Sequence, residues 1–457
     1  MRKFHYFGII FLCFSFSFFA CQKSLPVSKE EVLTPTSSRN NQFNGHLQQT
    51  KTFSSDVAVK WMSMQVFQMR NYPAVIGNVA YARHYAYSGV ALYEAVVPGM
   101  PAYQSIASQL NGLNILPRTK PGLAYHWGAS ANAVLASLNR KIFPNASTAN
   151  KTAMDNLENE LFAQFSTEAN TEVINRSIEF GKAVANAVYN WSETDGYKQV
   201  NNPYTPPAGK VGGIYWTPPS PLPVHSLPYL GNLRRLFATS GNGAEAPAPN
   251  YAALKDMTID VINSKPAVAT NEYNMAFWWR DFPGTSTPGH YVSILRQVLQ
   301  KHRPSLDIAA LAYALGGISV METAISTWQD KYKFLLARPV NYATVIPMAF
   351  TPWLGAPHPE YPAAHASLSM ANAEAMTSIF GDNFSFTDST FYGLVTPQGI
   401  TLQPRPYNAF RAAGEEAGWS RRYGGIHYRK SIEISFLQGK AVFQNIKTGI
   451  KFLKDID

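Results

Sequence analysis

The sequence is short of cysteine, acidic residues and strand-like alternation, and each shortage excludes a class of protein. Only two cysteines occur in 457 residues, which leaves no disulfide framework. Alternating polar and apolar residues are scarce, so a fold built mainly on β-sheet is excluded. Lys and Arg number 39 against 29 Asp and Glu, but the +10 charge is spread along the chain, which favours an anionic substrate over nucleic acid.

Residues 1–20 have the layout of a secretory signal peptide. Arg2 and Lys3 precede an apolar run at residues 7–19, which is too short to span a membrane. The Phe-Phe-Ala-Cys end resembles a bacterial lipoprotein cleavage site. We therefore expect lipidation of Cys21 and an exported protein held at a bacterial membrane by this lipid anchor alone, in the periplasm or at the outer-membrane surface. An ordinary signal peptide with an incidental cysteine is the alternative.

The rest of the chain divides into a tether and one large helical domain. Residues 21–55 are rich in Ser, Thr, Asn and Gln and predict a flexible tether, and residues 56–455 form the domain. Prolines and glycines crowd residues 192–250 and 381–406, which predicts loops, and aromatic residues in the first of these favour wrapping over a functional surface.

The fold class predicted for this domain is mainly α, with two halves that resemble four-helix bundles and long Pro/Gly-rich loops. Apolar residues recur at helical spacing in most of the remaining chain. The predicted helices are 57–67, 90–97, 122–141, 152–166, 171–192, 256–262, 290–301, 305–333, 366–380, 407–417 and 429–453.

The stretch Trp419–Ser431 carries an unusual amount of positive charge beside a histidine. Three arginines, two glycines and His427 lie within thirteen residues. Guanidinium groups donate paired hydrogen bonds to tetrahedral oxyanions, so the stretch is typical of one half of an oxyanion site. A solvated basic face with a structural histidine is the alternative for this stretch alone.

Two further motifs precede that stretch. Lys331 is followed by six residues and Arg338-Pro339, and Pro362-Ala363-Ala364-His365 comes next; Ser420-Arg421 is then followed by five residues and His427. The order and spacing of the three motifs resemble the signature of the vanadium-dependent haloperoxidases and the type-2 phosphatidic acid phosphatases, whose sites hold vanadate or phosphate alike. Residues 55–450 resemble the soluble bacterial haloperoxidase branch.

The resemblance assigns a role to each motif residue. Lys331, Arg338, Arg421 and the amide of Ala364 would hold the oxyanion, and His427 would be the axial ligand of vanadium in vanadate. His365 would be the acid–base group, at the start of a helix whose backbone donors face the anion. Taken singly, the cations could instead cap helix ends and His365 could be a core histidine.

A third histidine bears on the halide. His358 lies seven residues before His365, where bromide-oxidising relatives carry histidine and a chloride-oxidising relative carries phenylalanine. The resemblance therefore implies oxidation of bromide or iodide, although His358 lies in a proline-rich loop and could be exposed to solvent.

Three positions depart from the family pattern. The family has Ser-Gly before the first histidine, where this chain has Ala363-Ala364, so one hydroxyl donor to the oxyanion is lost. An aspartate follows the second histidine by four residues in the family, and Ser431 occupies that place here. Such a carboxylate fixes the tautomer of its histidine. Glu433 is a candidate replacement for it.

Three functions remain open on the sequence alone. The first is a vanadate-dependent haloperoxidase that oxidises halide with hydrogen peroxide. The second is an acid phosphatase that cleaves a phosphate ester through a phosphohistidine at His427. The third is a degenerate surface lipoprotein that binds oxyanions without turnover. Oligomerisation is left open.

Overall fold

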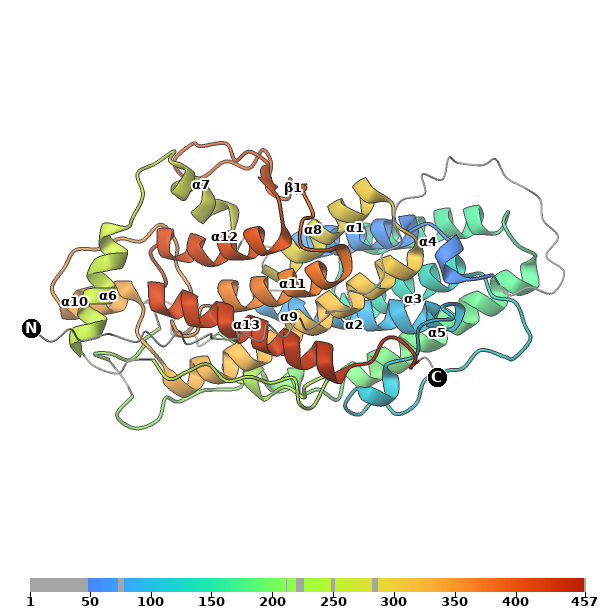
Figure 1. The fold of residues 1–457 in the computed structure, drawn as a ribbon, viewed down its shortest axis with the longest axis horizontal. Coiled ribbons are helices and arrows are strands. Elements are labelled where there is room, and N and C mark those ends of the chain that lie inside the picture. Colours follow the sequence, from blue (N-terminus) through green and yellow to red (C-terminus); the bar gives the residue numbers. More distant parts are fainter. Residues whose placement is uncertain are drawn as a thin grey trace, which may run out of the picture.

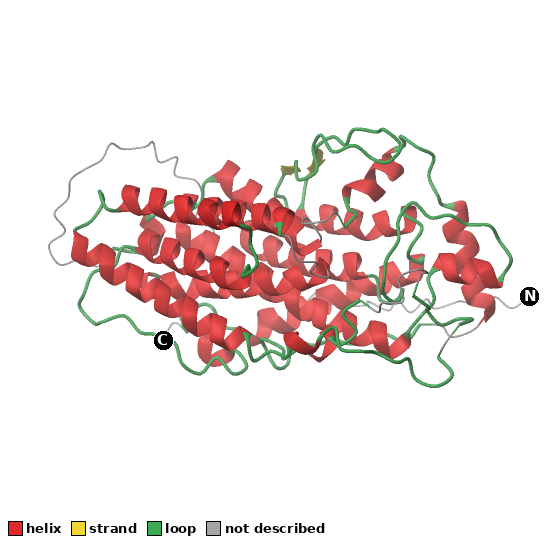
Figure 2. Cartoon of the chain, turned by 180° about the vertical axis from the view of Figure 1, so that it is seen from behind, coloured by secondary structure: helices red, strands yellow, loops and turns green. Residues whose placement is uncertain are grey.

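The computed structural model describes residues 48–72, 78–210, 212–218, 226–247, 251–281 and 287–455. Within these ranges, thirteen α-helices and one two-stranded sheet form an elongated molecule in which most helices follow the long axis (Figure 1, Figure 2). The predicted class, mainly α, is confirmed. The predicted signal peptide, the lipidation at Cys21 and most of the tether lie outside the described residues.

The elements follow one another along the chain with loops of very different lengths between them. They are α1 (Asp56–Asn71), α2 (Tyr81–Val96), α3 (Trp127–Ile142), α4 (Thr148–Phe165), α5 (Thr171–Ser192), α6 (Tyr251–Asn263), α7 (Asn271–Trp278), α8 (Thr287–His302), α9 (Leu306–Phe334), α10 (Pro339–Val345), α11 (Ala364–Phe380), β1 (Phe386–Asp388), β2 (Arg405–Tyr407), α12 (Phe410–Tyr423) and α13 (Arg429–Gly449).

Helix α9 joins the two halves of the molecule. It packs against α2 on the side of the first half, which contains α1–α5 and α8, and against α11 and α13 in the second half. Among the described residues it alone is long and apolar enough to cross a membrane, but 94% of its most apolar window is buried inside the protein. It is therefore the core helix that the two expected bundles share.

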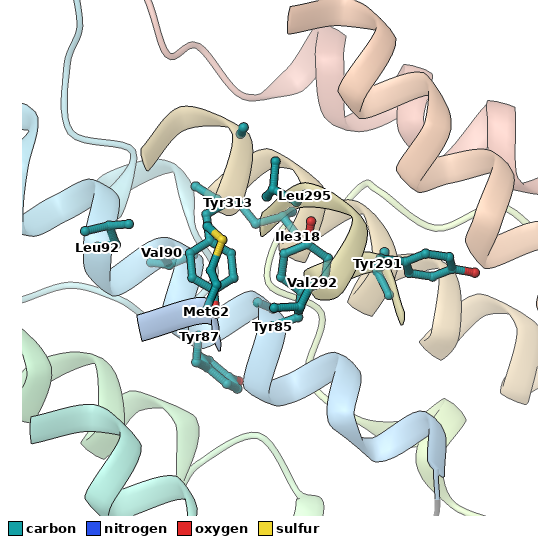
Figure 3. Packing of buried hydrophobic residues seen from close by; sticks show 14 of the residues in the cluster. Met62, Tyr85, Tyr87, Val90, Leu92, Tyr291, Val292, Leu295, Tyr313 and Ile318 are labelled. Carbon is teal, nitrogen blue, oxygen red and sulfur yellow. The ribbon is translucent and has the colours of Figure 1, made fainter. Parts of the chain in front are cut away.

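Glycines let α2 and α9 approach each other at backbone distance. A Cβ added at Gly317 of α9 would lie 2.7 Å from the Cα of Ala86, and one at Gly89 of α2 would lie 2.3 Å from the carbonyl oxygen of Tyr313. Next to this crossing, Tyr85 and Tyr313 pack with ring centroids 5.4 Å apart, and Met62 lies beside them in Figure 3. The close crossing packs the middle of α9 tightly against α2.

The structure corrects several predicted boundaries. Residues 381–406 are not wholly a loop, because β1 and β2 pair antiparallel there, and the helix predicted from residue 407 begins at Phe410. Helix α4 begins earlier than predicted because Ser147 accepts a hydrogen bond from the amide of Asn150. Helices α7 and α10 were not predicted. Residues 48–55 do not behave as tether, since Thr50 is buried and Ser54 pairs with Ser305.

The long loop after α5, which was predicted to wrap over a functional surface, packs along the C-terminal end of α9. Its described residues form only short 3-10 turns. The amide of Trp216 donates to the carbonyl of Leu335 at 2.7 Å, and the amide of Ser226 donates to the carbonyl of Pro357 at 3.1 Å. The loop thus covers the segment between α9 and α11, where the three motifs meet.

Candidate active site

Five predicted site residues come from five helix ends and lie buried together. Lys331 is in the last turn of α9, Arg338 immediately precedes α10, and His365 is the second residue of α11. Arg421 is in the last turn of α12, and His427 lies in the turn before α13. Each is 7% exposed or less. Motifs up to 96 residues apart are therefore gathered at one end of α9, from Lys331 to His427.

Both ring nitrogens of His427 have a partner, and the two partners fix its tautomer. Nδ1 lies 2.8 Å from Oε1 of Glu360, and Nε2 lies 3.3 Å from Nη1 of Arg338. A guanidinium can only donate, so Nε2 accepts and the proton sits on Nδ1, facing the carboxylate. Burial and the charges of Arg338 and Lys331 hold the pKa of His427 well below its ordinary value. His427 is thus neutral, with the lone pair of Nε2 directed at the cations.

Glu360 contacts His427 but was not among the residues predicted from the sequence. It is fully buried, accepts from the amide of Tyr428 at 3.0 Å and accepts from the hydroxyl of Ser431 at 2.9 Å. Burial raises the pKa of Glu360 to about 7, against the opposing hydrogen bond from Tyr428 and the charges of Lys331 and Arg338. By contrast, Glu433 is exposed.

A signal for Glu360 was present in the sequence. It is the only acidic residue between Asp330 and Glu374, in a run that contains two of the three motifs. A lone carboxylate just before the Pro362-Ala363-Ala364-His365 motif indicates a buried acid that pairs with the cations of the neighbouring motifs. Its partner His427 follows 67 residues later, beyond any local spacing rule.

Lys331 and Arg338 are held by the backbone of the turn that carries Glu360. The Lys331 ammonium donates to the carbonyls of Pro359 at 2.8 Å, of Glu360 at 3.0 Å and of Pro362. Arg338 donates from Nε to the carbonyl of His358 at 2.9 Å. Desolvation lowers the pKa of Lys331 well below its usual value and that of Arg338 to about 10, so Arg338 remains charged at neutral pH.

Arg421 approaches the site from the other side. Its Nη2 donates to the carbonyl of Ala276 at 2.9 Å, and its Nε donates to the hydroxyl of Ser420 at 2.9 Å. Burial lowers the pKa of Arg421 to about 10, while the nearby carboxylate of Asp281 opposes this shift. The positive charge of Arg421 in turn acts on His365. Arg421 is therefore a charged group at neutral pH despite its burial.

His365 is the inner end of a short polar chain that sequence reasoning did not identify. Its Nε2 lies 2.9 Å from the hydroxyl of Thr287, and that hydroxyl lies 3.0 Å from Oδ1 of Asp281. Burial and then the charge of Arg421 lower the pKa of His365 to about 3, against Asp281 and a backbone hydrogen bond with Trp279. Thr287 and Asp281 lie outside the three motifs, so only the tertiary structure reveals them.

Among the described residues, a cavity of about 180 Å³ lies next to His365. Its lining includes Asp281, Thr287, Trp328, His358, Ala364 and His365. His358 is half-buried rather than exposed, and its Nδ1 accepts from Nη2 of Arg338 at 3.0 Å. Arg338 therefore links the cavity wall to the buried group that contains His427.

The two alanines that depart from the family pattern differ in their surroundings. Ala363 packs with Ala366 and Ile432 in an apolar cluster and does not line the cavity, whereas Ala364 does. Ala363 has φ −79°, and Ala364 is helical, so neither position needs the left-handed backbone that favours glycine. Ala364 therefore lines the cavity without straining the chain.

The composition of the site fits an oxyanion. Lys331, Arg338 and Arg421 bring three buried basic side chains into the site. Among the site residues described above, Glu360 is the one fully buried acidic residue. Such an excess of buried cation is costly unless an anion offsets it. Among the described residues, no three His, Cys, Asp or Glu side chains are arranged to hold a metal ion, and an oxyanion bound through one histidine and cationic donors requires no such arrangement.

The comparisons with known proteins agree with the fold described above. Residues 341–451 match the family model of the VCPO second helical-bundle domain. The crystal structure of a bacterial vanadium-dependent iodoperoxidase is similar with a TM-score of 0.76 and 24% identity, over 88% of this chain and 98% of that one. A holo-type bacterial vanadium-dependent chloroperoxidase is similar with a TM-score of 0.62 and 15% identity, over 90% and 99% of the two chains. No curated protein matches the sequence significantly.

Proposed function

We propose that this protein, which has the fold of the vanadium haloperoxidases, is a vanadate-dependent peroxidase that oxidises bromide or iodide with hydrogen peroxide. The observation that carries the proposal is the state of His427. Its Nε2 is unprotonated, lies 3.3 Å from a guanidinium nitrogen of Arg338 and belongs to a ring held by Glu360 on the other side. A neutral imidazole nitrogen among buried cations is the ligand that an anionic vanadium centre needs.

The residues present suit vanadate as a cofactor. His427 would bind vanadium, and Arg338, Arg421 and Lys331 would neutralise its oxygens. When bound, vanadate supplies the Lewis acidity that activates peroxide. Lys331 and Arg338 now donate to backbone carbonyls, so each must exchange such a bond for one to an oxyanion. The Ala364 amide at the start of α11 is a further donor.

The protein's own acid–base group is His365, on the cavity wall. Because its pKa lies at about 3, it is neutral at pH 7 and can accept a proton from incoming peroxide. Nε2 of His365 is hydrogen-bonded to the hydroxyl of Thr287, which contacts Asp281, so these two residues at the cavity wall orient the ring for proton transfer.

Two observations support bromide or iodide as the halide. His358 lines the cavity at the position where bromide-oxidising relatives carry histidine. The similar structure with a TM-score of 0.76 is that of an iodoperoxidase. The imidazole ring of His358 is hydrogen-bonded to Arg338, and this bond polarises the ring. The polarised ring is a suitable contact for a large, weakly hydrated anion such as bromide or iodide.

Halogenation of a phenolic dye tests this proposal. Purified protein, reconstituted with orthovanadate and desalted, is expected to turn over iodide and bromide with peroxide, and the His427→Ala variant is expected to be inactive. If the protein instead hydrolyses p-nitrophenyl phosphate in a His427-dependent way and shows no halogenation, the peroxidase proposal is wrong and the phosphatase alternative is supported. Neither activity, together with loss of vanadate on desalting, would leave only the degenerate site.

We also propose that the protein is exported and anchored through a lipid at Cys21. The signal layout of residues 1–20 supports this proposal. Metabolic labelling with a fatty acid tests it. Label in the full-length protein and none in Cys21→Ser is expected, and an unlabelled full-length protein would contradict the anchor.

A further inference from the structure

We infer that Glu360 is the positioning carboxylate of His427, and that it replaces from another element the acid that Ser431 no longer provides. This inference rests on the proposed function insofar as it concerns oxyanion binding. Its structural basis is independent of any bound group. Glu360 lies in the turn before α11, whereas Ser431 lies in the first turn of α13, four residues after the histidine.

The geometry shows one carboxylate with two tasks. Oε1 of Glu360 is 2.8 Å from Nδ1 of His427, and Oε2 is 2.9 Å from the hydroxyl of Ser431. The serine is therefore a partner of the acid rather than a substitute for it. Its hydroxyl orients the second carboxylate oxygen so that the first faces the imidazole ring.

Glu360 also accepts a hydrogen bond from the backbone of the turn that carries His427. The amide of Tyr428, the residue after the histidine, donates to the oxygen that faces the ring, at 3.0 Å. Glu360 thus holds both the side chain of His427 and the backbone next to it. Glu433, the other acid near this end of α13, is exposed and cannot perform this task from its position.

Placement in the turn ties the histidine to the cations. Lys331 donates to the backbone carbonyl of Glu360 at 3.0 Å, and Arg338 donates to the carbonyl of Pro359 at 3.3 Å. The segment that orients His427 is therefore the segment that gathers two of the three cations. A carboxylate on α13 would orient the ring without this link.

The test measures the tautomer of His427 at one fixed pH, without vanadate and without turnover. Selective ¹⁵N labelling of histidine, with His427→Gln to identify the signal, is expected to show the proton on Nδ1 in the parent protein. Glu360→Gln is expected to give a mixture of tautomers, because an amide can either accept from Nδ1 or donate to it, and the 3.3 Å contact of Arg338 with Nε2 is too long to fix the tautomer alone. A parent His427 protonated on Nε2 would overturn the inference even if no variant folds.

A rescue variant separates positioning from mere stabilisation. Glu360→Ala should lose the fixed tautomer, and Glu360→Ala/Ser431→Asp should recover it, because the serine hydroxyl already lies one hydrogen bond from the vacated carboxylate. Glu433→Gln is the matched control and should change nothing. Loss of the tautomer in Glu360→Ala without recovery in the double variant would contradict the proposed replacement.

Calorimetric titration with orthovanadate adds the binding readout. Loss of the positioning carboxylate in Glu360→Gln should weaken vanadate binding by about 10- to 100-fold, as is usual for the partner of a ligating histidine. If the parent binds no vanadate, the proposed function fails, while the tautomer measurement still decides the role of Glu360. Unchanged vanadate affinity in Glu360→Gln, measured against a parent that binds, would overturn the inference.

Discussion

Nη1 of Arg338 lies 3.3 Å from Nε2 of His427, so a fixed cation faces the nitrogen that would ligate vanadium. The same guanidinium donates to the carbonyls of His358 and Ile426. One planar group therefore connects the cavity wall, the turn before α13 and the candidate ligand. This relationship leads to the first prediction.

Arg338→Lys should weaken vanadate binding at least about tenfold, equivalent to about 1.4 kcal/mol. A lysine keeps the charge but replaces the planar fork, which reaches the carbonyls of His358 and Ile426 and the ring of His427, with a compact ammonium that cannot span these positions. Calorimetric titration measures the change. Arg411→Lys is a suitable control, because Arg411 pairs with Glu374 and Asp382 at the surface. Equal losses in the two variants would mean that Arg338 has no special place in the site.

The two alanines before His365 should respond differently. Ala364→Gly removes a methyl group from a residue that lines the cavity and should tighten vanadate binding. Ala363→Ser places a hydroxyl in the cluster with Ala366 and Ile432, so it should give no gain in affinity and should lower stability by about 1 kcal/mol or more. Titration and urea unfolding of each single variant check both statements. Tighter binding in Ala363→Ser alone would show that its side chain reaches the oxyanion.

Much of the fold and of the site was accessible from the sequence, for identifiable reasons. Helix α9 was predicted within one residue at each end because its apolar pattern is long and uninterrupted. Strands β1 and β2 have three residues each, too few for an alternating pattern to appear. The motif residues were found by spacing, whereas Glu360 and Thr287 were missed because their partners are distant in sequence.

Acid should destabilise the protein through its buried neutral histidines. Burial lowers the pKa of His84 to about 4 and that of His365 to about 3. The unfolded chain protonates these rings near an ordinary pKa of about 6.5, so it binds more protons than the folded chain below that pH. The stability from these groups is present above pH 6.5 and is lost as the pH falls toward 4 and 3.

Urea unfolding at several pH values between 7.5 and 5 measures this effect. Each such histidine contributes up to about 1.4 kcal/mol per pH unit in the window below 6.5. The His84→Gln variant, far from the motifs, should show a shallower dependence than the parent protein. Because the raised pKa values of Glu360 and Glu94 give the opposite slope in this window, the comparison of the two proteins carries the test, and equal slopes in the parent and in His84→Gln would refute a neutral buried His84.

Gly317→Ala should destabilise the fold by about 1–3 kcal/mol, because an added methyl group must push α2 and α9 apart. The nearest atoms to such a Cβ are backbone atoms of Tyr85 and Ala86, which cannot move alone. Gly355→Ala is the matched control, since nothing lies within 4 Å of its added Cβ, and its effect should stay within about 0.5 kcal/mol. Denaturant unfolding compares the two variants, and equal effects would rule out the close crossing.

The central claim is that His427 and the three cations form one oxyanion site. A crystal of the protein soaked in orthovanadate, with anomalous data collected at the vanadium edge, tests this claim most directly. We expect a vanadium peak at bonding distance from Nε2 of His427, with its oxygens contacted by Arg338 and Arg421. A crystal that binds no vanadium, or that binds it away from His427, would contradict the account.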